Sequence, residues 1–245
     1  MLKNWDDRRD FYIGKDTKEA IDFAVEHWIH SAARAIQQRG RFVVALSGGS
    51  TPRAIYQILS KNKEIDWGKV WFFFSDERAV PPEHPDSNYK MWLESGFKYL
   101  PIPSSHIFRM EGESEIEKHA KDYEKIIENT LDKHLFDLVM LGLGEDGHTA
   151  SLFPKTKALE AKGSLVVANY LPEKNTWRMS FTFDCINNSR ASVIYALGKT
   201  KQMIVPQVLD AAIDSPFPAS RIGTTTSKCL WILDKDAAQL IENPE

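Results

Sequence analysis

The sequence predicts an α/β protein built on a mostly parallel β-sheet with helices on both faces. Six apolar runs of strand length recur along the chain, mostly continuous rather than alternating, which is typical of strands covered on both faces. Stretches with helical spacing stand between several of these runs, and this alternation favours a parallel sheet with right-handed crossovers. The predicted strands are RFVVALS (41–47), KVWFFFS (69–75), FDLVMLGLG (136–144), GSLVVANY (163–170), ASVIYALG (191–198) and CLWIL (229–233).

Capping residues and apolar periodicity predict the helices. Asp16 opens a capping box, and apolar residues at helical spacing follow it as far as Gly40. Pro52 suits the first helical position of the next helix, with Ser50 or Thr51 as the N-cap. Helices are expected over 16–40, 52–60, 87–98, 114–133, 199–212 and 235–242.

Length, charge and composition narrow the class of protein. The chain of 245 residues is 42% hydrophobic and has no repeat, low-complexity tract or linker, so we expect a single domain over 1–245. The net charge of -3, with dispersed Lys and Arg, offers no basic stripe to nucleic acid. A charged N-terminus and the lack of a long apolar run predict a cytoplasmic protein without a membrane segment. Cys185 and Cys229 fit no metal spacing and are expected to be reduced core thiols.

Three loops after strands concentrate Gly, Ser, Asp and His, and in parallel sheets such loops meet beyond the carboxyl ends of the strands. The first loop contains Gly48, Gly49 and Ser50. Their backbone N–H groups would gather at the positive end of a helix dipole, which suits an anion such as phosphate. A tight turn that needs glycine only for its geometry explains this loop equally well. No GK[ST] sequence follows, so the loop is not a Walker motif.

The second loop carries three charges, Asp76, Glu77 and Arg78, after an aromatic strand. A solvated loop end is the ordinary explanation for such a run. If this strand neighbours the first, however, Arg78 would offer a planar fork to a phosphate. Arg178 and Lys201 are two cations later in the chain that we expect near the same loops, beyond the carboxyl ends of the strands. Each of them alone is more typical of a surface charge.

The third loop, GLGEDGHTASLFP, is the most informative. Its glycines satisfy GxGxxG, but a dinucleotide site needs a long helix at the third glycine, and Pro154 follows seven residues later. We therefore expect the glycines to hold Asp146 and His148 at the strand end. His148 would then act as a general base, with Asp146 orienting the imidazole or carrying charge itself. A purely structural histidine is the alternative.

A serine nucleophile is a further hypothesis that the sequence disfavours. Ser47, Asp76 and His148 occur in the Ser, Asp, His order of α/β-hydrolases. Ala45, however, stands where the nucleophile elbow requires its first glycine, and the histidine follows a strand in mid-chain rather than lying in a late loop.

Taken together, the motifs resemble those of the 6-phosphogluconolactonases, within the larger group that includes glucosamine-6-phosphate isomerase/deaminase. The matching segments are SGGSTP, SDERAVPPEHPDSNY, GLGEDGHTASLFP, WRMSFTF, GKTKQ, FPASRI and CLWILDKDAA, in that order, from about residue 16 onward. The resemblance implies a Rossmann-like fold and hydrolysis of 6-phospho-D-glucono-1,5-lactone to 6-phosphogluconate in the oxidative pentose phosphate pathway. It implies a small sugar-phosphate lactone as the partner, with no metal or other cofactor. A monomer and a small homo-oligomer both stay open.

The resemblance also implies roles for individual residues. His148 resembles the catalytic base, with Asp146 as its neighbour in the Asp-Gly-His motif. The substrate-binding residues that it implies are Gly48, Gly49, Ser50, Asp76, Arg78, Arg178 and Lys201, the last three as phosphate and substrate cations.

Two alternative functions are weighed against hydrolysis. The isomerase/deaminase branch resembles DGHIAFNEP, with a glutamate that assists its histidine, whereas this chain has DGHTASLFP without a carboxylate. That branch also tends to carry Asp-Glu-Tyr where this chain has Asp76, Glu77 and Arg78, so both differences favour a lactonase. A non-catalytic sugar-phosphate sensor usually carries a DNA-binding segment, for which the region before residue 16 has no room.

Overall fold

The computed structural model describes residues 2–132 and 136–241 of the chain, which form two sheets. Seven strands form the large sheet in the order β1-β2-β10-β9-β6-β3-β4, parallel throughout except for the β1–β2 pair. A small antiparallel sheet has the order β5-β8-β7. The prediction of an α/β fold with a mostly parallel sheet is confirmed. The strands are β1 Lys3–Asn4, β2 Arg9–Gly14, β3 Phe42–Leu46, β4 Val70–Phe74, β5 Asp76–Arg78, β6 Leu138–Gly142, β7 Val166–Leu171, β8 Thr176–Phe181, β9 Ser192–Ala196 and β10 Cys229–Asp234.

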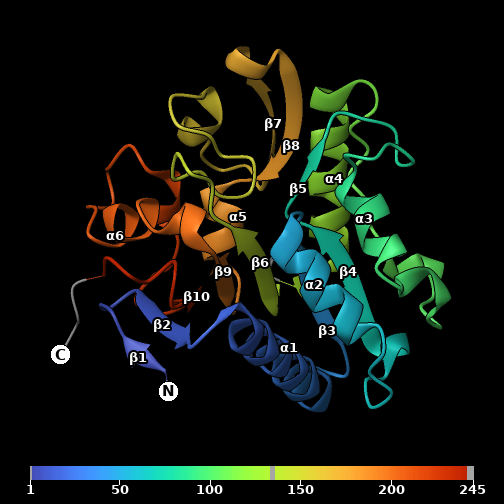
Figure 1. Ribbon diagram of the computed structural model, residues 1–245. Helices are drawn as coiled ribbons and strands as arrows, with labels where there is room; N and C mark the ends of the chain where they lie inside the picture. The colour runs from blue at the N-terminus through green and yellow to red at the C-terminus, as the bar shows by residue number, and fades with distance from the viewer. Residues whose placement is uncertain (1, 133–135, 242–245) are drawn as a thin grey trace.

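Helices cover both faces of the large sheet (Figure 1). Helices α1 and α2 lie in front of it in this view and α4 lies behind, where it packs against β7 and β8. The α-helices are α1 Thr17–Arg39, α2 Ser50–Leu59, α3 Asn88–Glu94, α4 Ile116–Thr130, α5 Phe183–Asn187 and α6 Ile204–Leu209. The described 3-10 turns are η1 Trp67–Lys69, η2 Phe97–Tyr99, η3 Ser104–His106, η5 Lys157–Glu160, η6 Pro172–Lys174, η7 Lys199–Lys201 and η8 Pro218–Arg221.

The central strands lie in the core, which explains their continuous apolar sequences. Every residue of β3 and of β9 is buried, because helices or loops cover both sides of these strands. Three tryptophans, Trp28, Trp92 and Trp231, are also fully buried and fill space between layers. Cys185 and Cys229 are both buried free thiols, as expected.

The first helix follows the prediction, but the second begins earlier than expected. Asp16 accepts a hydrogen bond from the backbone N–H of Glu19 at 2.8 Å, and Gly40 ends α1 in the left-handed conformation. The N-cap of α2 is Gly49 rather than Ser50 or Thr51, so that expectation is wrong. Gly49 has φ 111°, where a side chain would be strained, and the chain has already turned at this residue.

Two of the longer predicted helices are shorter in the structure. The segment predicted as 87–98 ends its helix at Glu94, because Gly96 adopts φ 115° and starts the 3-10 turn η2. The segment predicted as 114–133 is helical over α4 only, and its last residue lies outside the described residues.

The remaining two helices also differ from the prediction. The stretch 199–212 divides into η7 and the short helix α6. The stretch predicted as 235–242 forms turns over the residues that are described, so the helix prediction there is wrong; residue 242 lies outside them. The buried Asp234 carboxylate accepts hydrogen bonds from the backbone N–H groups of Gly198 and Ala237, which anchors this turn.

The strand GSLVVANY is the main departure from the predicted sheet. It forms β7 in the small antiparallel sheet, paired with β8, rather than a parallel strand covered on both faces. Strand β2 was not predicted, because its apolar run is only three residues long, yet it pairs with β10 in parallel. Among the described residues, no helix is long and apolar enough to cross a membrane.

Candidate active site

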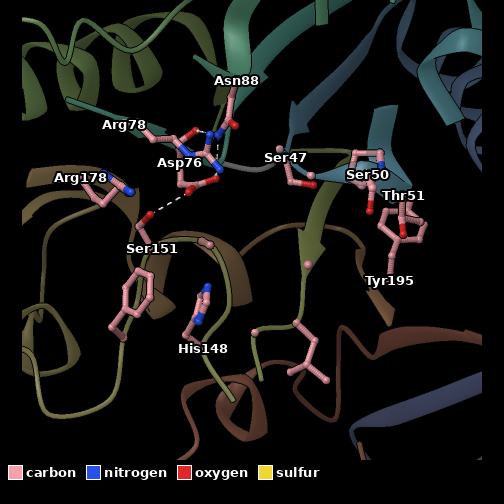
Figure 2. A pocket seen from close by; sticks show the side chains of 18 of the residues that line it. Ser47, Ser50, Thr51, Asp76, Arg78, Asn88, His148, Ser151, Arg178 and Tyr195 are labelled. Atoms are coloured by element: carbon pink, nitrogen blue, oxygen red, sulfur yellow. Dashed lines mark hydrogen bonds between the residues drawn. The ribbon is translucent and has the colours of Figure 1, made fainter. Parts of the chain in front are cut away.

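A cavity of about 460 Å³ opens where β3, β6 and β9 end, with β5 and β8 as a further wall (Figure 2). It is lined largely by polar and charged groups and by the glycine-rich loops. Its walls are Ser47, Gly48, Gly49, Ser50, Thr51, Pro52, Asp76, Arg78, Asn88, Gly142, Leu143, Gly144, His148, Ala150, Ser151, Phe153, Lys174, Arg178, Tyr195, Leu197, Thr200 and Lys201.

A histidine and an aspartate form a close pair at the edge of this cavity. His148 Nδ1 lies 2.5 Å from Asp146 Oδ1, and the same carboxylate oxygen accepts the backbone N–H of His148. Burial raises the pKa of Asp146, but the hydrogen bond and charge of His148 outweigh burial and lower that pKa to about 2. An ionised Asp146 accepts a hydrogen bond from Nδ1–H, so it fixes the tautomer in which Nε2 carries no proton.

The imidazole is held from two further sides. A Cβ at Gly144 would lie 2.0 Å from His148 Nδ1, so only glycine leaves room for the ring here. Phe153 stacks on the imidazole with ring centroids 3.9 Å apart and planes inclined by 22°. Figure 2 shows His148 pointing toward the space enclosed by Ser47, Asp76 and Ser151.

Asp76 is a buried carboxylate in the cavity wall, with 8% of its surface exposed. Its Oδ2 accepts a hydrogen bond from Ser151 Oγ at 2.7 Å, and its Oδ1 accepts one from Asn88 Nδ2 at 3.3 Å (Figure 2). Asn169 and Ser180 bond the backbone of Ser151 and so fix the loop after His148 against β7 and β8. Asp76 therefore joins the small sheet to the third loop.

Glu77, the neighbour of Asp76, serves the structure rather than the cavity. Its two carboxylate oxygens accept the backbone N–H groups of Arg78, Asn88 and Tyr89 and the hydroxyl of Ser87, at the start of α3. Burial raises the pKa of Glu77, while these backbone hydrogen bonds lower it to a smaller extent. This cap positions α3, and with it the Asn88 side chain.

Arg78 and Arg178 face each other across the small sheet, where they are register partners in the β5–β8 pair. Burial lowers the pKa of Arg178, and the like charge of Arg78 lowers it further. Neither guanidinium forms an ion pair with a described carboxylate; Arg178 bonds only Thr176 Oγ1 and the carbonyl of Trp177. The charges of Asp76, Asp86 and Glu77 oppose this lowering of the Arg178 pKa without forming an ion pair. Two adjacent guanidinium groups whose N–H donors are not taken by a carboxylate are typical of an anion-binding wall.

The opposite end of the cavity combines backbone N–H groups with a lysine. Gly49 to Thr51 form the start of α2, whose dipole attracts anions. Lys201 comes from η7, directly after β9, and forms no ion pair with a carboxylate among the described residues. Tyr195 of β9 and Thr51 of α2 line the same cavity, so both segments contribute to this wall (Figure 2).

The structure brings nearly all of the predicted site residues to one cavity. Only Asp146 does not line it, and this residue contacts His148 instead. Sequence reasoning did not single out Asn88, Ser151, Phe153 or Lys174. Asn88, Ser151 and Phe153 lie inside the sequence motifs that resemble the family, so those motifs could have pointed to them. Lys174 lies in none of these motifs.

The described residues do not form a serine-nucleophile triad. The Ser47 hydroxyl is buried and has no hydrogen-bond partner among them, and His148 pairs with Asp146 rather than with Asp76. Among the residues that the structure describes, no group of three or more His, Cys, Asp or Glu is placed to hold a metal ion.

Comparison with known proteins identifies the family. The model for glucosamine-6-phosphate isomerases/6-phosphogluconolactonase matches residues 15–231. The chain belongs to this family. It is 40% identical to a 6-phosphogluconolactonase of Chlamydia pneumoniae, over 98% of this chain and 94% of the relative, and 33% identical to one of Haemophilus influenzae, over 81% and 87%.

Solved structures of family members have the same fold. The crystal structure of 6-phosphogluconolactonase from Thermotoga maritima matches with a TM-score of 0.81 and 30% identity, over 93% of this chain and all of that one. A structure described as devB protein matches with a TM-score of 0.87 and 29% identity, over 96% of this chain and all of that one.

Proposed function

We propose that this protein hydrolyses 6-phospho-D-glucono-1,5-lactone to 6-phosphogluconate, the lactonase step of the oxidative pentose phosphate pathway, with His148 as the general base. One observation carries the proposal: a single imidazole, oriented by an ionised carboxylate, faces a cavity whose walls carry an excess of unpaired cations. The relatives that bear the name 6-phosphogluconolactonase match this chain over nearly its whole length, which supports the same substrate.

Charge complementarity supports a phosphorylated substrate. The cavity walls carry four cations, Arg78, Lys174, Arg178 and Lys201, against the one carboxylate of Asp76. A phosphate monoester carries about -1.5 to -2 charges at neutral pH. We place the phosphate at the start of α2 with Lys201, so the sugar ring extends toward His148. Binding the distant phosphate then orients the lactone carbonyl.

The proposed reaction uses one free nitrogen of the imidazole. With Nδ1–H bonded to Asp146, Nε2 accepts a proton from water as the water oxygen attacks the lactone carbonyl. The ionised Asp146 stabilises the imidazolium that forms. When the bond between the carbonyl carbon and the ring oxygen breaks, His148 returns the proton to that oxygen. The carboxylic acid produced then ionises, so each turnover releases one proton to the solvent.

The isomerase/deaminase reaction is less consistent with this site. Ring opening in that branch uses a glutamate downstream of the histidine, but residues 147–155 contain no carboxylate. In its place Phe153 covers the imidazole face. The imidazole therefore has Asp146 as its only described carboxylate partner, which suits the activation of water.

Proton release from freshly made lactone tests the proposal. His148→Gln is expected to lose turnover by about 10²- to 10⁴-fold, while calorimetry still detects binding of 6-phosphogluconate. His30→Gln, an exposed histidine of α1, is the matched control and should behave as the wild type. Full turnover by His148→Gln would contradict the role of this residue. Wild-type protein that binds without turnover would indicate a sensor, and ammonia released from glucosamine 6-phosphate would indicate an isomerase/deaminase.

A further inference from the structure

Lys174 is a cation of the cavity that belongs to none of the recognised motifs. It is the last residue of η6, the turn between β7 and β8, and Asn175 follows it in the left-handed conformation with φ 44°. This turn brings the exposed Lys174 side chain back over the third loop, where its Nζ lies 4.8 Å from the centre of the Phe153 ring. Because Phe153 also stacks on His148, one phenyl ring contacts both the ammonium and the imidazole.

The contact that Lys174 makes is weak and easily exchanged. A cation over an aromatic ring at an exposed site contributes about 0.5–1 kcal/mol. Lys174 forms no ion pair with a described carboxylate, unlike Lys18 or Lys125, which are paired on their helices. An anionic group on a bound ligand would therefore compete readily with Phe153 for this ammonium.

The position of Lys174 separates its role from that of Lys201. Lys201 follows β9 and lines the cavity together with Ser50 and Thr51 of the start of α2, where we place the phosphate. Lys174 instead reaches the wall built by Phe153 and His148. In the proposed reaction His148 activates the water that attacks the lactone carbonyl, so this wall is the one that faces the reacting carbon. The group that becomes negative at this carbon is the carbonyl oxygen during attack, and then the carboxylate of the product.

We propose that Lys174 binds this developing oxyanion and the product carboxylate, and so is a further catalytic residue contributed by the β7–β8 turn. This inference rests on the proposed lactonase function. In it, the ammonium leaves the Phe153 ring and donates a hydrogen bond to the oxygen of the reacting carbon, whereas Lys201 stays with the phosphate.

Binding of two ligands tests the assignment without turnover. The first is 6-phosphogluconate, and the second is D-glucitol 6-phosphate, which keeps the phosphate and hydroxyl groups but has an alcohol in place of the carboxylate. Lys174→Met is expected to weaken binding of 6-phosphogluconate by about tenfold and to leave binding of the alditol within about twofold of the wild type. Lys162→Met removes an exposed lysine outside the cavity and controls for the change in net charge.

Turnover gives the second readout. Lys174→Met should lower kcat for the phosphorylated lactone and kcat/KM for unphosphorylated glucono-1,5-lactone by similar factors, because the oxyanion is common to both. Equal weakening of both phosphate ligands would mean that Lys174 contacts the phosphate, and no weakening of either would remove it from the site; both outcomes overturn the inference. If the wild-type protein does not hydrolyse the lactone, the proposed function itself fails. Measuring wild-type turnover first therefore separates failure of the proposed function from failure of the Lys174 assignment.

Discussion

Asp146→Asn tests whether the carboxylate beside His148 takes part in the reaction by stabilising charge. The wild-type carboxylate lies 2.5 Å from His148 Nδ1 and stays ionised because its pKa is lowered to about 2. The asparagine keeps the size of the side chain but has no charge to stabilise the imidazolium that forms when His148 takes a proton. The carboxylate does not line the cavity, so substrate binding should change little.

The size of the effect follows from the pKa shift of Asp146, from 3.8 to about 2. A shift of this size equals an interaction of about 2 kcal/mol in full, but the Asp146 side chain is 49% exposed, so screening by solvent reduces it to about 1–2 kcal/mol. We therefore expect kcat to fall by about 5- to 30-fold, with KM within about threefold of the wild-type value.

The assay is proton release from freshly made lactone, corrected for spontaneous hydrolysis, at several pH values between about 5 and 8. Asp146 remains ionised over this range because its pKa is about 2, so its own titration should add no pH dependence to the wild-type rate. Glu145→Gln removes an adjacent exposed charge and serves as the control. An equal fall in kcat in both variants, or an unchanged kcat in Asp146→Asn, would refute the reasoning.

Three further variants test separate parts of the site. Gly144→Ala should lower kcat at least tenfold in the proton-release assay, because the added Cβ would lie 2.0 Å from His148 Nδ1. Gly142→Ala is the control: its Cβ would meet nothing within 4 Å, so its kcat should stay near the wild-type value. Glu77→Ala should lower the free energy of unfolding in urea by about 2–3 kcal/mol, because buried N–H groups at the start of α3 lose their acceptor; an unchanged midpoint would argue against this cap. Ser47→Ala should retain turnover within about threefold, because its hydroxyl has no described partner; lost turnover, with a serine-directed covalent label on the wild type only, would restore the nucleophile hypothesis.

The sequence predicts the large sheet well because its signal is local. Continuous apolar runs such as β3 and β9 are buried on both faces, and this burial determines their composition. The same signal misleads for β7, because a strand of a small antiparallel sheet has a similar apolar sequence when α4 covers it. Strand β2 escapes notice because its apolar run, Phe11 to Ile13, is only three residues long, and pairing with β10 places it in the sheet.

The candidate site is predictable to the extent that parallel strands bring their carboxyl ends together. That rule alone places the loops with Gly48, Asp76 and His148 at one cavity. Contacts between loops are not local in sequence, so Ser151 on Asp76 could not be predicted. Lys174 is harder still, because its place in the cavity depends on the length and turn of the β7–β8 hairpin.

The electrostatics of the cavity differ from those of the structural ion pairs elsewhere in the protein. At the amino end of the central strand β6, Arg39 and Arg190 both pair with the buried Asp137, so those arginines have a counter-ion in the folded chain. Arg78 and Arg178 face each other instead, and no described carboxylate pairs with either. Like charges in direct register destabilise a sheet; the charges of Asp76, Asp86 and Glu77 act on Arg178 with the opposite sign, and an anionic ligand in the cavity would add to their effect. The cavity walls gather four cations against the one carboxylate of Asp76, and this local excess of positive charge suits a multiply charged anionic ligand.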